Sequence, residues 1–258
     1  MKLFCVTLTG ADDNTDPAKL LELSRRFPFV EWGILLSEGR AGSGRYPEGK
    51  WLRELHDAIY DLPWRPQRGF AAHLCGKTMR KVVSGDDTWG DHHWLSPSNV
   101  ATMFSRFQLN FSARREGYDE EVLNSLFSRW LYAFAKPMIT QEHAGNDGVT
   151  EILQDQDQTH YRSYRLHQVL HDASGGRGVA PDVVPQPVAG MLNGYAGGIG
   201  PDNVIDRLNA VEAAVGRGYC WIDMENSLRD ENDQFDLDRA TSVLEQVASE
   251  GGKRGWIS

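Results

Sequence analysis

Cysteine is scarce in this 258-residue sequence, and strongly basic segments and long apolar runs are missing. Cys5, Cys75 and Cys220 are far apart and form no Cys-x-x-Cys pair, which excludes a disulfide framework and fits a reducing cytoplasm. No apolar run approaches the roughly 20 residues that cross a bilayer, and the apolar start is too short for a signal peptide. The formal net charge of −9 argues against nucleic-acid or anionic-membrane partners, although a local basic pocket for one small anion remains compatible with it.

Strong metal and cofactor motifs are also missing. The stretches 91–93 and 142–147 contain histidine and acidic residues, but neither has the HExxH or HxH spacing of a metal site. The "GGRG" at 175–178 lacks the lysine of a P-loop and the order of a dinucleotide-binding fingerprint. We therefore expect neither a metal nor a cofactor.

What the sequence does contain is a regular alternation of short apolar runs and amphipathic segments. Helices are predicted by apolar residues at helical spacing, and the first of them begins with an aspartate and a proline as cap and first turn. The predicted strands are 2–8, 29–36, 69–75, 106–112, 136–141, 165–172, 188–197 and 218–225. The predicted helices are 16–27, 47–62, 96–107, 119–135, 201–215 and 236–248.

Strands that alternate with helices indicate a parallel sheet, and eight such units in about 250 residues are typical of a (β/α)8 TIM barrel. An open doubly wound sheet also alternates, but it usually has fewer strands and an early glycine-rich turn. We predict an α/β protein with a single domain, 1–258. The polar segments 76–98 and 142–164 are expected to be extended loops, the second of them at the barrel mouth.

A glycine-rich turn, "GYAGGIGPDNV" (194–204), follows the seventh predicted strand. Three glycines leave backbone amides bare, and Pro201 and Asp202 suit the first turn of a helix. Bare amides at a helix N-terminus bind anions, most often phosphate, and barrels commonly place a phosphate site at this point. The alternative is a tight strand-to-helix connection that binds nothing.

Several segments, in the same order along the chain, resemble phosphoribosylanthranilate isomerase, a (β/α)8 barrel of tryptophan biosynthesis. "KLFCVTLT" is similar to the first strand of that family, and "GSGRYPE" (42–48) to its Ser-Pro-Arg-Tyr turn. "VLHDASGGRG" (169–178) is similar to its sixth-strand aspartate and the loop that follows. "YAGGIGPDNV" (195–204) resembles its Gly-Gly-Leu-x-Pro-x-Asn-Val turn, and "WIDMENSLRD" (221–230) occupies the place of its eighth-strand segment.

The resemblance implies an isomerase that converts a phosphorylated aminoaldose into a ketose by an Amadori-type rearrangement, with Cys5 as base and Asp172 as acid. Each residue also has a structural alternative. Cysteine often packs as a small buried side chain, and Asp172 could cap a helix or pair with Arg177.

The phosphate of the implied substrate, a small phosphorylated sugar, is expected at the amides of Gly176, Gly197 and Gly198, with Asn226 and Ser227 reaching it from the eighth strand. Arg45 is expected to approach the substrate, and its alternative is an ion pair with Glu48 or Glu31.

Departures from the family pattern surround the expected substrate. Val6 follows the cysteine where glycine is usual, the fourth strand contains "FQLNFS", and Met224 to Ser227 replace small residues. These changes favour a changed substrate. They also motivate a second hypothesis, a non-catalytic protein that captures a phosphorylated sugar or nucleotide in the phosphate cup. The sequence carries no signal for the oligomeric state.

Overall fold

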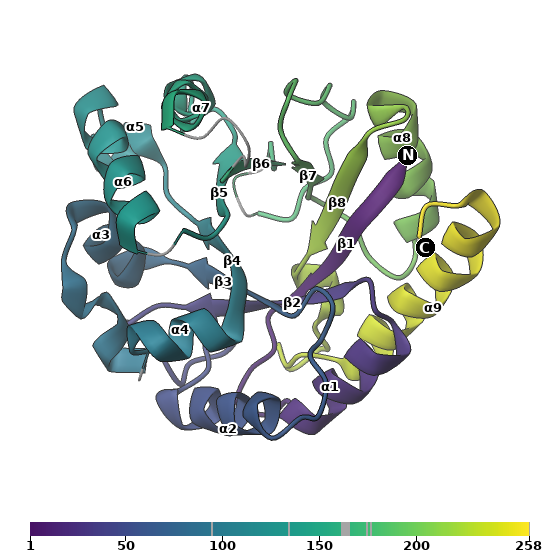
Figure 1. Ribbon diagram of the computed structural model, residues 1–258. Helices are drawn as coiled ribbons and strands as arrows, with labels where there is room; N and C mark the ends of the chain where they lie inside the picture. The colour runs from purple at the N-terminus through teal and green to yellow at the C-terminus, as the bar shows by residue number, and fades with distance from the viewer. Residues whose placement is uncertain (94, 134, 161–165, 174, 176, 258) are drawn as a thin grey trace.

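Eight parallel strands close into one barrel in the order in which they follow along the chain (Figure 1). The computed structural model describes residues 1–93, 95–133, 135–160, 166–173, 175 and 177–257. All neighbouring strands are parallel, including the closing pair β1 and β8. The strands are β1 (Lys2–Thr9), β2 (Val30–Leu36), β3 (Phe70–Leu74), β4 (Phe104–Leu109), β5 (Met138–Glu142), β6 (His167–His171), β7 (Asn193–Tyr195) and β8 (Tyr219–Met224). The predicted (β/α)8 fold is confirmed.

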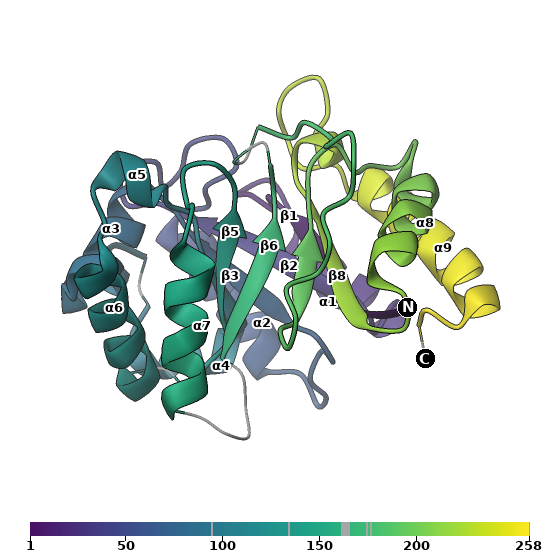
Figure 2. The same ribbon diagram turned by 90° about the horizontal axis from the view of Figure 1, so that it is seen from above.

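Helices surround the strands on the outside of the barrel (Figure 2). Asp16 caps the first of them by accepting a hydrogen bond from the amide of Ala18, as the Asp-Pro start predicts. No helix in the described part of the chain is long and apolar enough to cross a membrane. The helices are α1 (Pro17–Arg26), α2 (Gly49–Tyr60), α3 (Gly76–Ser84), α4 (Pro97–Met103), α5 (Ala113–Glu116), α6 (Glu120–Ala133), α7 (Val149–His160), α8 (Val204–Val215) and α9 (Leu237–Arg254), with 3₁₀ turns η1 (Asp87–His93) and η2 (Asn226–Leu228).

The two segments expected to be loops contain barrel helices instead. The segment 76–98 holds α3 and η1, and 142–164 holds α7. Although α7 has a polar sequence, Val149 and Leu153 are buried one turn apart and Ile152 packs beside the core. The long excursion lies elsewhere: the described residues between β6 and β7 form no helix, so β7 starts only at Asn193.

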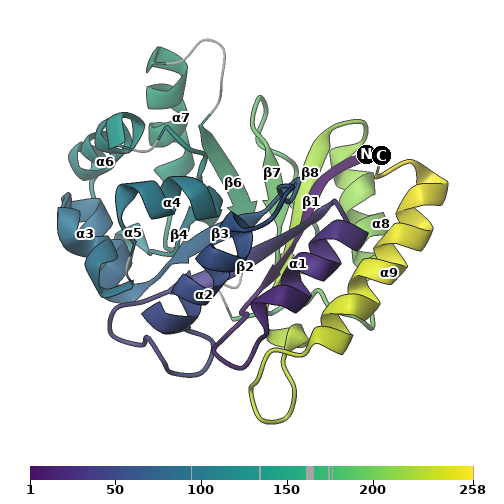
Figure 3. The ribbon, with the colours of Figure 1, turned by 60° about the horizontal axis from the view of Figure 1, so that its bottom comes forward.

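The strands are buried from outside by the surrounding helices. Outside the strands, large apolar side chains pack against the helices; Trp32, for example, is fully buried and donates from its indole nitrogen to Ser24 of α1. The two chain ends lie close together at the base of β1 (Figure 3), where the amide of Leu3 donates to the carbonyl of the buried Trp256. Strands buried on both faces explain why the predicted strands are nearly continuous apolar runs.

The barrel interior contains a buried ion pair. The guanidinium of Arg106 donates from Nε to Oε1 of Glu31 at 2.9 Å and from Nη2 to Oε2, and both side chains are at most 3% exposed. Thr7 also donates to this carboxylate, while Gln168 accepts from Nη1. All the polar atoms of the pair therefore have partners, which a charge in a barrel core requires.

Candidate active site

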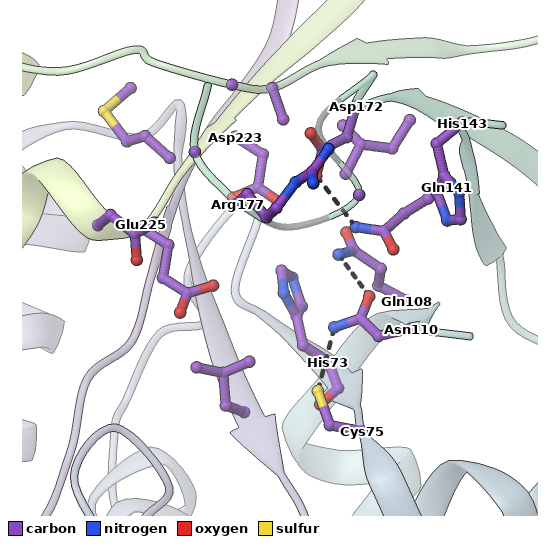
Figure 4. Close-up of a pocket in the computed structure, with 18 of the residues that line it drawn as sticks. His73, Cys75, Gln108, Asn110, Gln141, His143, Asp172, Arg177, Asp223 and Glu225 are labelled. Atoms are coloured by element: carbon purple, nitrogen blue, oxygen red, sulfur yellow. Dashed lines mark hydrogen bonds between the residues drawn. The ribbon is translucent and has the colours of Figure 1, made fainter. Parts of the chain in front are cut away.

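A cavity of about 1120 Å³ opens at the carboxyl ends of the strands. Its lining comes from the ends of β2 to β8 and from the loops that follow them. Figure 4 shows acidic, imidazole and carboxamide side chains directed into it. The carboxyl end of the strands is where (β/α)8 barrels carry their catalytic residues.

Two buried carboxylic acids line this cavity from β6 and β8, the two strands on either side of β7. Asp172 directly follows β6, is 4% exposed, and accepts from Nε2 of Gln141 at 3.5 Å. Asp223 lies in β8, is 6% exposed, and accepts from Oγ1 of Thr9 at 2.8 Å. Burial, reinforced by the charges of Glu225 and Glu31, raises the pKa of Asp223 well above its usual range. This environment favours the protonated form of Asp223, which is the form that a general acid needs.

Asp223 went unnoticed in the sequence. The sequence does offer a clue, because Asp223 lies near the end of the strand predicted at 218–225. Side chains two residues apart in a strand point to the same face, so Asp223 and Glu225 are expected to point the same way, and both line the cavity. An acid that closes an apolar strand in a barrel is a candidate for the mouth, which is the argument that singles out Asp172.

The pH dependence of the free energy of unfolding tests the raised pKa of Asp223. Because the folded protein binds the Asp223 proton more tightly than the unfolded chain does, this group lowers stability as the pH rises above the ordinary carboxyl pKa of about 4. Asp223→Asn keeps an acceptor for Thr9 and removes the charge. We expect its stability relative to the wild type to increase as the pH rises above about 4, measured by urea unfolding at each pH. A difference that is independent of pH would contradict a raised pKa of Asp223.

The structure does not bring Cys5 to the cavity, which corrects the position expected for the base. Cys5 lies in the middle of β1, four residues before the strand ends at Thr9, or about 13 Å deeper along the strand. It is fully buried and lies against Arg106, whose Nη2 donates to its sulfur at 3.2 Å. Burial and the nearby Glu31 raise the pKa of the thiol, so the thiolate that a base requires is disfavoured.

Arg45 does reach the cavity, but its expected alternative partners are wrong. Its guanidinium forms ion pairs with Glu225 and with Asp233, the latter at 2.9 Å, and donates to Oδ1 of Asn226 at 2.6 Å. Arg45 thus links the loop after β2 to the end of β8. Its positive charge is balanced by two carboxylates of the same protein.

The glycine-rich turn after β7 also lines the cavity. Gly197 and Gly198 have positive φ angles, and within the described residues their amides donate to no protein acceptor. A Cβ at Gly198 would lie 2.8 Å from Cβ of Ala180, so these glycines also allow the segment 178–180 to pack closely. Both sequence interpretations, bare amides and a tight connection, therefore describe part of this turn.

The remaining residues expected at the phosphate have local partners. Ser227 lines the cavity and donates from Oγ to the carbonyl of Ile199, which joins the turn after β7 to the end of β8. Asn226 lines it too and accepts from Arg45. Gly176 lies outside the described residues.

The opposite wall of the cavity, at the ends of β3 to β5, carries neutral polar side chains that sequence reasoning missed, and Arg115 of α5 lines the cavity as well. The neutral side chains include Gln108 and Asn110 of the β4 end, Gln141 of β5, and His73 and Cys75 at the end of β3 (Figure 4). Burial lowers the pKa of His73 to about 3, so this imidazole is neutral as well. Across the described chain, no three metal-binding side chains converge.

No protein-family model and no curated protein matches this sequence. Solved structures do match over nearly the whole chain. Phosphoribosylanthranilate isomerase from Thermus thermophilus has 14% identity and a TM-score of 0.55, covering 96% of this chain and 99% of its own. TrpF from Jonesia denitrificans has 13% identity and a TM-score of 0.57, covering 97% of both chains.

A third match is a phosphoribosylanthranilate isomerase in complex with reduced 1-(o-carboxyphenylamino)-1-deoxyribulose 5-phosphate. It has 13% identity and a TM-score of 0.52, covering 96% of this chain and all of the other. At such identities the likeness is one of fold. The resemblance found in the sequence is confirmed at that level.

Proposed function

We propose that this protein is an isomerase of a phosphorylated aminosugar, working by an Amadori-type rearrangement. The observation that carries the proposal is the pair of buried acids, Asp172 and Asp223, on one cavity at the barrel mouth. General acid–base catalysis needs two groups of opposite protonation state on the same substrate. The fold shared with phosphoribosylanthranilate isomerases supports the choice of reaction.

The two acids can divide the proton transfers. Asp223, whose protonated form burial favours, gives a proton to the ring oxygen of the aldose, and the C1–O bond breaks as the amine lone pair forms a C1=N bond. Asp172 then takes the proton from C2, which gives an enolamine that tautomerises to the ketose. One proton is donated and one removed, so the reaction is an isomerisation without a cofactor. The roles implied by the resemblance change accordingly: Asp172 replaces Cys5 as the base.

The phosphate of the substrate fits the turn after β7. Gly197 and Gly198 line the cavity six or seven residues before α8 begins, and within the described residues their amides donate to no protein acceptor, which leaves them available to an anion. Asn226 and Ser227 border the same place. With phosphate there, the sugar carbon atoms would extend toward the acids of β6 and β8.

Gly198→Ala should weaken binding of a phosphorylated ligand by at least about tenfold, or 1.4 kcal/mol. The new methyl group would crowd Ala180 and shift the turn that presents the amides. Gly216→Ala is the matched control, because Gly216 has a similar φ of +65° but nothing within 4 Å of the added carbon. Titration calorimetry with the reduced deoxyribulose 5-phosphate analogue measures both variants. Equal affinities in the two variants would contradict the proposal that the turn after β7 binds the phosphate.

Turnover tests the proposed function itself. The purified protein should convert phosphoribosylanthranilate or a related phosphorylated aminosugar, and its gene should rescue a tryptophan auxotroph that lacks this isomerase if phosphoribosylanthranilate is the substrate. Tight binding of such ligands without conversion of any of them would favour the second hypothesis, a non-catalytic binding protein. That hypothesis has its own support, since Cys5 lies outside the cavity and Arg45 is neutralised by Glu225 and Asp233.

A further inference from the structure

One histidine on the cavity has no part in the reaction described so far. His143, in the segment 142–147, is the first residue after β5 and lines the cavity. On β5 itself, Ile139 packs inside the barrel in one cluster with Leu170, and Gln141 lines the cavity. Side chains two residues apart in a strand point to the same face, so His143 continues this inward row.

His143 lies next to the proposed base. β5 and β6 pair with Glu142 opposite His171, and the amide of Asp172 donates to the carbonyl of Glu142 at 3.3 Å, so the pairing continues past both strand ends. The next pair along is His143 and Asp172. Neighbouring strands are about 4.8 Å apart, which places these two side chains side by side on one face. Figure 4 shows both of them, with Gln141, on one side of the cavity.

The proton of this imidazole has a fixed place. The amide of Gly145 donates to Nδ1 of His143 at 3.0 Å, and a ring nitrogen that accepts a hydrogen bond carries no proton. The neutral imidazole is therefore protonated at Nε2. Within the described residues Nε2 has no hydrogen-bond partner. His143 is only partly buried, so it can meet a ligand in the cavity.

Two glycines hold the ring in place. A Cβ at Gly145 would lie 2.9 Å from Cε1 of His143, and a Cβ at Gly175, in the loop after β6, would lie 3.7 Å from Cγ. The backbone of both loops therefore packs against the imidazole, and at Gly145 only a residue without a side chain allows so close an approach. Nε2 is not among the ring atoms nearest to either glycine, which leaves this edge of the ring to the cavity.

We infer that His143 is a substrate-binding residue of the proposed isomerase, and that its Nε2–H donates to the oxygen on C2. Asp172 takes the proton from C2 in the proposed reaction, so a donor beside Asp172 lies beside the other substituents of that carbon. The oxygen on C2 begins as a hydroxyl and ends as a carbonyl, which can only accept. A fixed N–H donor binds this oxygen in both forms and adds no proton transfer to the reaction. The inference rests on the proposed function for the position of C2.

The hydrogen bond can be measured by removing each of its partners in turn. One ligand is reduced 1-(o-carboxyphenylamino)-1-deoxyribulose 5-phosphate, which has a hydroxyl on C2, and the other has hydrogen in place of that hydroxyl. Titration calorimetry gives the ratio of their dissociation constants. We expect His143→Leu to reduce the wild-type preference for the hydroxyl ligand by at least about fivefold. A ratio within about twofold of the wild-type ratio overturns the inference, as does a wild type that binds neither ligand.

Two carboxamide variants separate the donor from the rest of the imidazole. In His143→Gln the carboxamide nitrogen reaches about as far as Nε2 and can donate there. In His143→Asn the carboxamide extends only about as far as Nδ1, where its oxygen can accept from Gly145. We expect His143→Gln to keep the wild-type preference within about threefold and His143→Asn to lose it as His143→Leu does. Equal preferences in the two carboxamide variants would contradict a donor at Nε2, even if His143→Leu failed to fold.

The tautomer can be observed without any ligand. Nitrogen–proton correlation spectra of the imidazoles should show the neutral form of His143 protonated at Nε2, and a neutral form protonated at Nδ1 would overturn the inference.

Turnover and the ligand ratio can fail separately. Conversion of a phosphorylated aminosugar, with an unchanged ratio in His143→Leu, would retain the isomerase and reject the hydrogen bond. A ratio that falls as expected, in a protein that converts no such sugar, would retain the hydrogen bond and reject the isomerase.

Discussion

Asp172→Asn should lower kcat on a phosphorylated aminosugar by about 10²- to 10⁴-fold, the usual contribution of a general acid or base. The side chain lies at the end of β6 on the cavity, where an asparagine has the same shape but cannot take a proton from C2. Ligand affinity should stay within about threefold, because an isosteric change leaves most ground-state contacts in place. Single-turnover kinetics and calorimetry with the reduced analogue separate the two effects.

Two further variants make this measurement specific. Asp223→Asn should cause a loss of similar size, but through the other proton: an asparagine cannot protonate the ring oxygen. Cys5→Ser is the control, because Cys5 is fully buried beside Arg106 and outside the cavity. Its kcat should change by less than about threefold while its stability falls, as for a packed core side chain. A large loss of kcat in Cys5→Ser with Asp172→Asn nearly active would reverse the assignment.

The (β/α)8 fold could be predicted from the alternation of strands and helices in the sequence. The elements that were predicted wrongly have local causes. Alternation is a strong signal where the chain is apolar, as in β1, β2 and β8, and these strands were predicted within one or two residues. The helix α7 was missed because few of its residues face the core, and Leu153 and Val149 are its main contacts. Conversely, the strand predicted at 188–197 includes residues of the long β6–β7 connection, whose apolar residues imitate a strand.

Depth along a strand decided which site residues could be predicted. Asp172 is the first residue after β6 and Gly197 the second residue after β7, and both line the cavity. Cys5 lies in the middle of the predicted range 2–8, so its depth was implicit in the sequence, although the family resemblance assigned it a catalytic role. The partners of Arg45 could not be predicted, because Glu225 and Asp233 reach it only through the closure of the barrel, about 180 residues further along the chain.

The barrel interior should be the most sensitive region for stability, and Arg106→Met tests it. The substitution would leave Glu31 buried and without its cation, and breaking a buried ion pair from one side costs about 3–5 kcal/mol. For a chain of this size that corresponds to a decrease of roughly 6 to 20 °C in Tm. Differential scanning calorimetry at pH 7 measures it.

The double variant Arg106→Met with Glu31→Leu distinguishes an ion pair that stabilises the barrel from one that is only costly to break. Removing both charges leaves no uncompensated carboxylate, and apolar replacements of buried pairs are often neutral or stabilising. We therefore expect the double variant to recover most of the Tm lost in Arg106→Met, although Gln168 and Thr7 lose the partners that they have in the pair. If the double variant is less stable than Arg106→Met, the pair contributes net stability, and the four-residue hydrogen-bond network around it is what the barrel core depends on.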